Sequence, residues 1–587
     1  MVNLKINGIP VGVEEGTSIL NAAKKVNIKI PTLCYNPDLP PWASCGICIV
    51  RLAGSPKMVR ACTTPVTENM DIVTHDAEII AVRRTVVELI LSNHPNDCLQ
   101  CPRNGNCELQ TLAAEFGIRE VPYKKVLNAL PIDDSNPAIV LNPEKCIRCG
   151  RCVKVCQEMQ NVWALEFLGR GIKGRIASAA DTPLGESPCI KCGQCAAHCP
   201  VGAIYERDDT VKVWAALQNP GVHTVVQIAP AVRVALAEEF GLEPGTILTK
   251  KIYAALRRLG FKTVFDTNFS ADLTIMEEGT ELVKRLTSGG DVPLITSCCP
   301  AWVDYMEKYY ADMIPNFSTA KSPQQMMGAM IKAYWAGKAG VDPDKVYSVS
   351  VMPCTAKKWE TKRNDDMKSA GHNYDVDIAI TTRELARMIK QAGIEILKLD
   401  DEDADNPLGP YTGAGTIFGV TGGVMEAAVR SAYYLVTKKE LGDVNFLPVR
   451  GLDGVKEAEV DFGVSVGNLG TKIRIAVAHQ MGNIAAVLDR IRAARDAGEE
   501  TPYHFVEVMA CRGGCIAGGG QPYGCTDEVR SQRTKGIYND DQKSQYRCSH
   551  QNPFIRQVYD EFLGEPNGHR AHELLHTKYV ERPLYLK

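Results

Sequence analysis

The spacing of the cysteines constrains this chain more than any other feature of its sequence. Of the 22 cysteines, all but Cys525 and Cys548 fall into tight groups along the chain. Residues 1–6 read as the start of a strand and not as a secretory signal, so we expect a cytoplasmic protein. Thiols in the cytoplasm are kept reduced, and grouped thiols there indicate metal sites and not disulfides.

The overall composition argues against two classes of function. With 587 residues, 45% of them hydrophobic and 23% charged, the chain is long enough for about four globular domains. The net charge is -3, and Lys and Arg are scattered without the basic stripe of a nucleic-acid-binding protein. No apolar run approaches the roughly 20 residues that span a bilayer. We therefore expect neither a nucleic-acid partner nor a membrane partner.

Residues 1–78 are predicted to form a small α+β domain. Alternating apolar residues on both sides of Asn7-Gly8 predict a hairpin, and Thr17 or Ser18 can cap a helix running to Val26. Four cysteines with the spacing C-x10-C-x2-C-x13-C follow, and they suit an iron–sulfur cluster or zinc. These cysteines are Cys34, Cys45, Cys48 and Cys62. The segment resembles a β-grasp, plant-type 2Fe–2S ferredoxin, which favours one 2Fe–2S cluster over zinc.

Residues 79–138 begin with a predicted amphipathic helix and continue with a second ligand set. The apolar residues expected on the buried helix face are Ile79, Val82, Val86, Leu89 and Ile90. The ligand set is His94-x3-Cys98-x2-Cys101-x5-Cys107, in which the histidine stands at ligand spacing. Imidazole in place of a thiolate removes one negative charge and raises a cluster's potential. The pattern resembles the His-ligated 4Fe–4S segment of NADH:quinone oxidoreductase iron–sulfur subunits and of some hydrogenases.

Residues 139–209 contain an internal repeat. Cys146-x2-Cys149-x2-Cys152-x3-Cys156 recurs as Cys189-x2-Cys192-x2-Cys195-x3-Cys199-Pro200. This is the pattern of bacterial two-cluster ferredoxins, in which the fourth cysteine of each run serves the other cluster. We therefore expect one 4Fe–4S cluster on Cys146, Cys149, Cys152 and Cys199, and another on Cys189, Cys192, Cys195 and Cys156. Each cluster carries one electron at a time, so we expect these sites to form an electron-transfer chain and the catalytic site to lie further along the sequence.

Residues 210–525 alternate short apolar strands with helices, which predicts an α/β catalytic domain. Three of the predicted strands lead directly into cysteine-bearing loops, at 293–296, 346–351 and 506–509. Open α/β sheets bind their ligands at the carboxyl ends of strands, so we expect these loops to meet. The acidic stretch 400–405 is expected to be a solvated loop between two lobes, and residues 526–587 to wrap the catalytic domain.

The last of these loops, from Cys511 to Pro522, carries Cys511 and Cys515 among many glycines. Glycine lets the backbone approach a bulky group closely, and thiolates are soft metal ligands. The loop is suited to wrapping around an iron–sulfur centre. A glycine-rich surface loop with two idle thiols is the alternative.

Three segments, 296–302, 352–360 and 507–522, closely resemble the signature loops of iron-only ([FeFe]) hydrogenases, and the resemblance covers essentially the whole chain. It implies an H-cluster: a 4Fe–4S cubane joined through a cysteine to a di-iron azadithiolate unit that bears CO and cyanide. Carried over by motif, the cubane ligands are Cys299, Cys354, Cys511 and Cys515, with Cys515 as the bridge. The implied reaction is the reversible reduction of protons to H2.

The same resemblance implies roles for residues around the cluster. A proton route runs through Cys298, Glu278, Ser318 and Glu281, with Arg285 near its mouth. Lys357 is similar to the lysine that pairs with a cyanide ligand. Residues that resemble the lining of the di-iron pocket are Met352, Met509, Pro230, Gln324 and Phe418. Read without the resemblance, Glu278 and Glu281 fit a solvated helix face, Cys298 an inert thiol and the pocket residues plain core.

The length and layout resemble the catalytic subunit of NAD(P)-linked, electron-bifurcating hydrogenases. Gly413-Ala414-Gly415 has the wrong spacing for a dinucleotide loop, so the chain itself carries no nicotinamide or flavin fingerprint. The resemblance implies three partners: a flavin/NAD(P)-binding iron–sulfur subunit, a small thioredoxin-like 2Fe–2S subunit and ferredoxin. A stand-alone ferredoxin-dependent hydrogenase is the main alternative. An electron-transfer subunit of respiratory NADH dehydrogenase leaves the cubane cysteines unexplained, and an iron–sulfur assembly protein leaves Cys298 and Lys357 unexplained.

Overall fold

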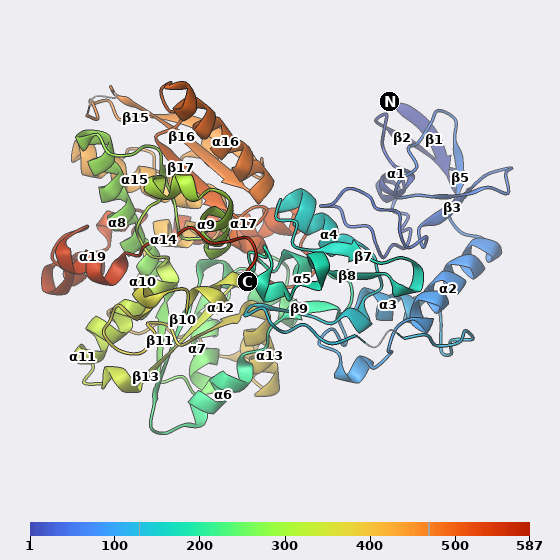
Figure 1. Ribbon diagram of the computed structural model, residues 1–587, viewed down its shortest axis with the longest axis horizontal. Coiled ribbons are helices and arrows are strands. Elements are labelled where there is room, and N and C mark those ends of the chain that lie inside the picture. Colours follow the sequence, from blue (N-terminus) through green and yellow to red (C-terminus); the bar gives the residue numbers. More distant parts are fainter. Residues whose placement is uncertain (128–129, 468–469, 587) are drawn as a thin grey trace. The chain divides into compact units, whose positions relative to one another are not determined.

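The computed structural model describes residues 1–127, 130–467 and 470–586, which divide into two compact units (Figure 1). The first unit comprises Met1–Met159, Trp163–Ser187 and His198–Tyr205. The second comprises Gln160–Val162, Pro188–Ala197 and Glu206–Lys587. The first copy of the repeated cysteine motif belongs to the first unit, and most of its second copy belongs to the second unit.

The first unit begins with the predicted β-grasp arrangement. Its five-stranded sheet has the order β2-β1-β5-β3-β4. The strands are β1 (Val2–Ile6), β2 (Ile9–Val13), β3 (Ile49–Leu52), β4 (Met58–Arg60) and β5 (Asp71–Val73). Asn7 and Gly8 both have positive φ, as the predicted hairpin turn requires. Helix α1 (Ile19–Lys25) starts at Ser18, whose hydroxyl accepts the N–H of Asn21, and the helix buries its apolar face in the core of this sheet.

The predicted buried face of the next helix is partly wrong. Helix α2 (Ala77–Ser92) forms, but Val82 is 37% and Leu89 46% exposed. Arg83 takes an inward position, and its guanidinium donates to the backbone carbonyl of Ile49 at 2.6 Å. The buried face of the helix is rotated from the predicted one, because it includes an Arg that provides a hydrogen bond to a buried strand carbonyl. A pattern of hydrophobic residues does not reveal such a position.

Short elements make up much of the rest of the first unit. They are α3 (Glu108–Glu115), β6 (Ile139–Leu141), α4 (Arg151–Lys154), and the hairpin of β7 (Glu166–Leu168) and β8 (Arg175–Ala177). Arg151 is buried and holds α3 through a bidentate pair with Glu108, at 2.6 and 2.7 Å. Segments this short lack an extensive core, so ion pairs and the expected clusters contribute more to their stability.

The second unit is built on two four-stranded sheets; Figure 1 shows β10, β11 and β13 of the first in green to yellow, and β15, β16 and β17 of the second in orange. The first sheet is entirely parallel, with the order β11-β10-β13-β14. Its strands are β10 (His223–Ile228), β11 (Thr263–Asp266), β13 (Val346–Met352) and β14 (Ile378–Thr381). The second sheet has the order β12-β17-β16-β15, in which only β15 runs antiparallel. Its strands are β12 (Leu294–Ile295), β15 (Val455–Asp461), β16 (Lys472–His479) and β17 (Phe505–Met509).

Long helices pack around these sheets, and α8 (Thr267–Ser288) is central among them. It contacts α10 (Pro323–Met330), α14 (Gly413–Ile417) and α15 (Gly423–Thr437). Further helices are α6 (Thr210–Gln218), α7 (Thr249–Leu259), α9 (Pro300–Tyr309), α11 (Ala336–Lys338), α12 (Ala356–Glu360), α13 (Thr382–Gln391) and α16 (Met481–Ala497). The predicted two-lobed α/β architecture is confirmed.

Residues after 526 fold onto this unit and do not form a separate layer. Helix α17 (Asp527–Lys543) contacts α14, α18 (Pro553–Val558) contacts α8, and α19 (His569–Leu575) contacts α10. Buried arginines make the attachment polar: Arg533, for example, pairs with Glu238 at 2.7 Å. No helix in the described ranges is long and apolar enough to cross a bilayer.

Candidate active site

Three cysteine loops leave the carboxyl ends of β12, β13 and β17, as the strand pattern predicted. Cys299 follows β12 and is the N-cap of α9, with Pro300 in the first turn. Cys354 follows β13, and Cys511 and Cys515 follow β17. Loops at the ends of strands from two different sheets thus bring cysteines that lie more than 200 residues apart in sequence to one region.

The four predicted cubane cysteines lie within electrostatic reach of one another. Burial and then the neighbouring Cys299 thiolate raise the pKa of Cys354 to about 12. Burial, followed by Cys354 and Cys299, raises the pKa of Cys511 well above its ordinary value. None of the described cysteines is joined in a disulfide. Buried thiolates that repel one another require a cationic partner, so this donor set fits an iron–sulfur cubane.

The glycines of the last loop allow close contact between backbone segments, a role that the sequence did not indicate. A Cβ at Gly518 would lie 2.2 Å from the carbonyl oxygen of Pro353, and one at Gly519 would lie 2.4 Å from that of Cys192. Gly514 has a φ of 96°, and its Cβ would lie 2.6 Å from the Thr421 nitrogen. The glycines therefore let three backbone segments touch each other. The loop is buried from Ile516 to Pro522, which excludes an exposed surface loop.

The loop of Cys189, Cys192 and Cys195 is fastened to the same region of the second unit. Gln194 Nε2 donates to Cys511 Sγ at 3.1 Å and to the Ala517 carbonyl at 3.0 Å. Thr355, next to Cys354, donates its hydroxyl to the Lys191 carbonyl at 2.7 Å. Two neighbouring cysteine-bearing loops are therefore connected by direct hydrogen bonds.

Lys357 lies beside Cys298 and has a carboxylate partner. Its Nζ donates to the Cys298 carbonyl at 3.2 Å and pairs with Glu360 Oε2 at 2.9 Å. Burial lowers the pKa of Lys357, but the Glu360 carboxylate outweighs this and the net shift is upward. Gln324 also donates to Glu360, at 2.9 Å, and fixes that carboxylate. The ammonium is thus held charged next to the cysteine loop.

Glu278 and its predicted partners lie along α8 and the segment after α9. Glu278 is 1% exposed, and neither of its carboxylate oxygens has a hydrogen-bond partner among the described residues. Burial raises its pKa to about 8. Ser318 Oγ donates to Glu281 Oε2 at 3.4 Å, and Glu281 Oε1 pairs with Arg285 at 2.6 Å. A carboxyl protonated at neutral pH therefore stands at the inner end of a chain of polar groups.

The thiol of Cys298 is also buried in an environment that keeps it protonated. Its pKa is raised well above the ordinary value, chiefly by burial. The predicted pocket residues are all buried, and they come from the ends of β10, β13 and β17 and from two helices: Pro230, Met352, Met509, Gln324 and Phe418.

The other predicted accessory ligands, apart from Cys189, Cys192 and Cys195, lie within the first unit. Cys34, Cys48 and Cys62 are buried and Cys45 is partly so, and the Cys45 N–H donates to Cys34 Sγ at 3.5 Å. Burial and then the Cys199 thiolate raise the pKa of Cys146 to about 11. That influence places Cys199 near Cys146, and the crossed assignment of the two clusters stays a prediction.

His94 is oriented as a ligand would be. Its Nδ1 lies 3.3 Å from the side-chain oxygen of Asn96, which accepts the Nδ1–H and leaves the lone pair on Nε2, and Nε2 is buried without a hydrogen-bond partner in the described part of the chain. Burial lowers its pKa, so the ring is neutral. A neutral imidazole with one nitrogen fixed and the other unused is suited to a metal.

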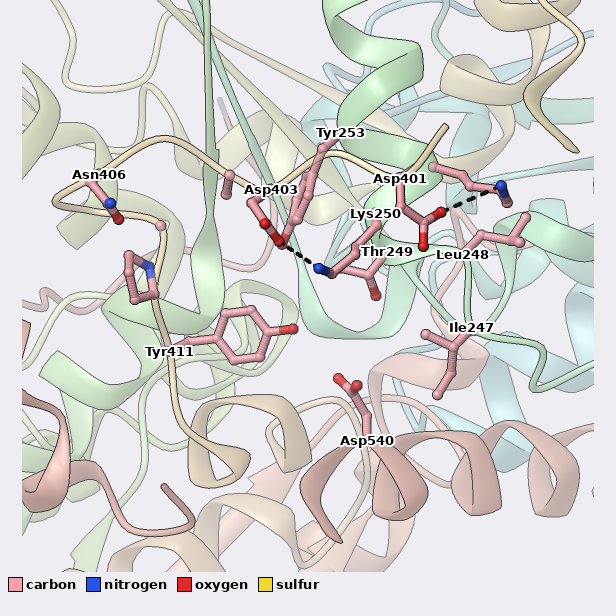
Figure 2. A pocket seen from close by; sticks show the side chains of 14 residues that line it. Ile247, Leu248, Thr249, Lys250, Tyr253, Asp401, Asp403, Asn406, Tyr411 and Asp540 are labelled. Carbon is pink, nitrogen blue, oxygen red and sulfur yellow. Dashed lines mark ion pairs between the residues drawn. The ribbon is translucent and has the colours of Figure 1, made fainter. Parts of the chain in front are cut away.

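The loop at 400–405 borders a pocket of about 620 Å3, shown in Figure 2. The side chains of the 400–405 loop are largely solvated, as expected, but ion pairs connect the loop to α7. Lys250 pairs with Asp403 at 2.9 Å and Lys251 pairs with Asp401 at 3.4 Å. The pocket also includes Tyr411 and Asp540. None of the described residues that line it is a predicted site residue.

Sequence reasoning missed three polar residues of this region. Gln194 donates to the sulfur of Cys511, a predicted ligand, but nothing in its motif marked it. Glu360 stands one helical turn after Lys357, and that spacing was a usable signal for their pairing. Glu507 lies on β17, accepts the N–H groups of Gly422 and Met425, and has a pKa raised by burial to about 7.

Comparison with known families covers nearly all of the chain. Residues 222–519 match the C-terminal domain of the iron-only hydrogenase large subunit, and residues 527–582 match the iron hydrogenase small subunit. The N-terminal matches are a 2Fe-2S iron–sulfur cluster binding domain at 1–77, the NADH-ubiquinone oxidoreductase-G iron–sulfur binding region at 83–122 and a 4Fe-4S dicluster domain at 145–204.

Two relatives match from end to end. The "NADP-reducing hydrogenase subunit HndD" of Solidesulfovibrio fructosivorans is 47% identical, over 99% of this chain and 99% of the relative. "Iron hydrogenase 1" of Clostridium pasteurianum is 39% identical, over 99% of this chain and 100% of the relative. The solved [FeFe]-hydrogenase HydA1 from Chlamydomonas reinhardtii superimposes with a TM-score of 0.55 at 43% identity, over 64% of this chain and 99% of that one. With this fold, this set of converging thiols and these matches, the chain belongs to the iron-only hydrogenase family.

Proposed function

We propose that the chain interconverts protons and H2 at an H-cluster held by Cys299, Cys354, Cys511 and Cys515. The observation that carries the proposal is the convergence of these four cysteines, two buried and two partly buried, from loops on two sheets. When bound, the H-cluster supplies the redox centre at which two electrons and two protons are exchanged with H2. The protein holds that centre, excludes water from it and moves protons and electrons to it.

Electrons are proposed to reach the site through four accessory clusters. One 2Fe–2S cluster is held by the cysteines of the β-grasp domain, one 4Fe–4S cluster by His94, Cys98, Cys101 and Cys107, and two by the crossed cysteine runs. The last electron transfer, from the Cys192 loop to the proposed H-cluster site, is supported by direct contacts between the two loops. Gln194, from the Cys192 loop, donates to Cys511 Sγ, and Gly519 lies against Cys192. A hydrogen bond to a ligand sulfur also tunes the potential of a cluster.

Protons are proposed to travel between solvent and the site through Arg285, Glu281, Ser318, Glu278 and Cys298. Glu281 and Ser318 share a hydrogen bond, and Glu281 is held by Arg285. Glu278 is neutral at pH 7 because of its burial, so it is able to donate a proton inward and take up another from outside. The Cys298 thiol is the inner terminus, and Lys357, paired with Glu360, keeps a positive charge beside it.

We further propose that the chain works as the catalytic subunit of a cytoplasmic NAD(P)- and ferredoxin-linked, electron-bifurcating complex. The end-to-end similarity to a subunit of an NADP-reducing hydrogenase supports this view. The expected partners are a flavin/NAD(P)-binding iron–sulfur subunit, a small thioredoxin-like 2Fe–2S subunit and ferredoxin. A stand-alone ferredoxin-dependent hydrogenase is the second candidate, because "Iron hydrogenase 1" matches over the same length.

The proposed activity is tested by hydrogen evolution from reduced methyl viologen with the purified, matured chain. We expect evolution by the unmodified protein and none by Cys354→Ala, which removes one cubane ligand. Evolution that survives in Cys354→Ala would refute the assigned ligand set. Adding candidate partner subunits and NADPH, with and without reduced ferredoxin, then separates the complex from the stand-alone alternative.

A further inference from the structure

Cys548 lies outside every predicted cluster site, yet it is one of three metal-ligating side chains that meet on the surface of the second unit. We propose that Cys548, His550 and Glu440 form a site for one Zn2+ ion. The site connects the C-terminal segment to the chain just beyond the end of α15. It is independent of the hydrogenase chemistry.

The three residues already stand near the spacing that zinc needs. One ligand atom from each lies within 4.8 Å of the other two. His550 Nε2 is 3.2 Å from both carboxylate oxygens of Glu440. Zn–N, Zn–O and Zn–S bonds of about 2.0 to 2.3 Å in a tetrahedron place ligand atoms about 3.3 to 3.8 Å apart. Small side-chain rotations therefore complete the site.

The imidazole of His550 is held in place from behind. Its Nδ1 lies 3.1 Å from the Ser431 hydroxyl, which leaves Nε2 directed at Glu440. Its ring stacks on Tyr434 with centroids 4.3 Å apart and planes 3° from parallel. A hydrogen bond on one nitrogen and a fixed ring plane are the usual support of a metal-binding histidine.

Gln551 orients the other two ligands. Its Nε2 donates to Glu440 Oε2 at 3.0 Å, and its Oε1 accepts the backbone N–H of Cys548 at 3.3 Å. One amide side chain thus links the segment that carries the thiol to the carboxylate. Each proposed ligand has a defined neighbour, which separates this group from a chance meeting of polar residues.

Burial and charge also suit a divalent ion. Cys548 is 1% exposed, whereas the Glu440 side chain is 55% exposed and leaves a path for the ion and room for a water ligand. Thiolate and carboxylate together balance the two positive charges, and binding releases the thiol proton of Cys548 to solvent. Nearby Arg430 and Arg547 do not oppose the ion, because both pair with Asp541. A sulfur, nitrogen and oxygen set selects zinc over Mg2+ or Ca2+, which prefer oxygen alone.

The test uses the full chain with its iron–sulfur clusters in place. After treatment with EDTA, one equivalent of zinc sulfate and desalting, zinc and iron per chain are measured by mass spectrometry. We expect about one zinc per chain in the unmodified protein and in Cys525→Ala, which removes the other leftover thiol, and almost none in Cys548→Ala. Ser431→Ala should weaken zinc binding roughly 10- to 100-fold, because it removes only the support of the histidine. Unchanged iron content shows that the clusters, and hence the fold, survive.

Zinc-edge X-ray absorption identifies the ligands directly. We expect one Zn–S distance of about 2.3 Å together with nitrogen and oxygen neighbours, and loss of the sulfur shell in Cys548→Ala. Glu440→Gln changes an exposed residue, so it decides the matter if the buried Cys548 variant does not fold. Unmodified protein that takes up no zinc, or Cys548→Ala or Glu440→Gln that binds zinc as the unmodified chain does, would overturn the proposal.

Discussion

The buried carboxyl of Glu278 determines how activity should depend on pH if protons use the proposed route. Burial raises its pKa to about 8. At that value about nine in ten carboxyls are protonated at pH 7 and about one in ten at pH 9. Hydrogen evolution needs the protonated form as donor, so it should fall as pH rises through 8. Hydrogen oxidation needs the carboxylate as acceptor, so it should rise over the same range.

Glu278→Gln keeps the size of the side chain and removes the titrating group. We expect turnover in both directions to fall by about 10²- to 10⁴-fold, the usual contribution of a positioned proton-transfer group, and the residual rate to lose its pH dependence near 8. The assay is viologen-linked evolution and oxidation from about pH 6 to about pH 9, normalised to the H-cluster content measured by infrared spectroscopy.

Glu277→Gln is the matched control. Glu277 precedes Glu278 on α8 and is equally buried, but its carboxylate is bonded to the Tyr559 hydroxyl, the Asn567 N–H at 2.7 Å and His576 at 3.0 Å. This variant should keep the turnover per active site and its pH profile. If Glu278→Gln also turned over like the unmodified chain at every pH, the protons would have to bypass this residue and the reasoning would be wrong.

Three other predictions follow from the site. Cys298→Ala and Cys298→Ser should retain the active-site cluster, seen by infrared spectroscopy, but lose nearly all turnover; full activity in either would remove Cys298 from the proton path. Arg383→Ala should lower the free energy of unfolding by about 3–5 kcal/mol, measured by chemical denaturation. Arg383 pairs with the buried Glu206 carboxylate at 2.7 Å and donates to the Gly519 carbonyl, so the substitution leaves both without this partner. An unchanged unfolding transition would show that the pair is dispensable. The isolated chain should evolve no hydrogen from NADH, since it has no nucleotide fingerprint, and evolution without added subunits would contradict the proposed division of labour.

The strand-end cysteine loops could be predicted from the sequence because their signals are local. An apolar run followed by Cys, or Cys followed by Pro300, specifies a strand, a loop and a helix start within a few residues. The hairpin at Asn7-Gly8 and the helix cap at Ser18 were predictable for the same reason.

Features that depend on tertiary contacts could not be predicted in this way. The buried face of α2 was misplaced, because Arg83 turns inward to a carbonyl of β3 that no pattern within the helix reveals. The reason for the glycines at 518 and 519 was likewise hidden, since the atoms they avoid belong to loops over 160 residues away in sequence. Gln194 is positioned by Cys511, so its role emerges only once both loops have folded.

The most direct test of the central claim is an infrared spectrum of the anaerobically purified, matured protein. Stretching bands of iron-bound CO and cyanide should be present, and they should disappear in Cys515→Ala, which removes the proposed bridge to the di-iron unit. If the unmodified chain shows no such bands, and a synthetic di-iron precursor restores neither the bands nor hydrogen evolution, then the four converging thiols do not hold an H-cluster and the central claim is contradicted.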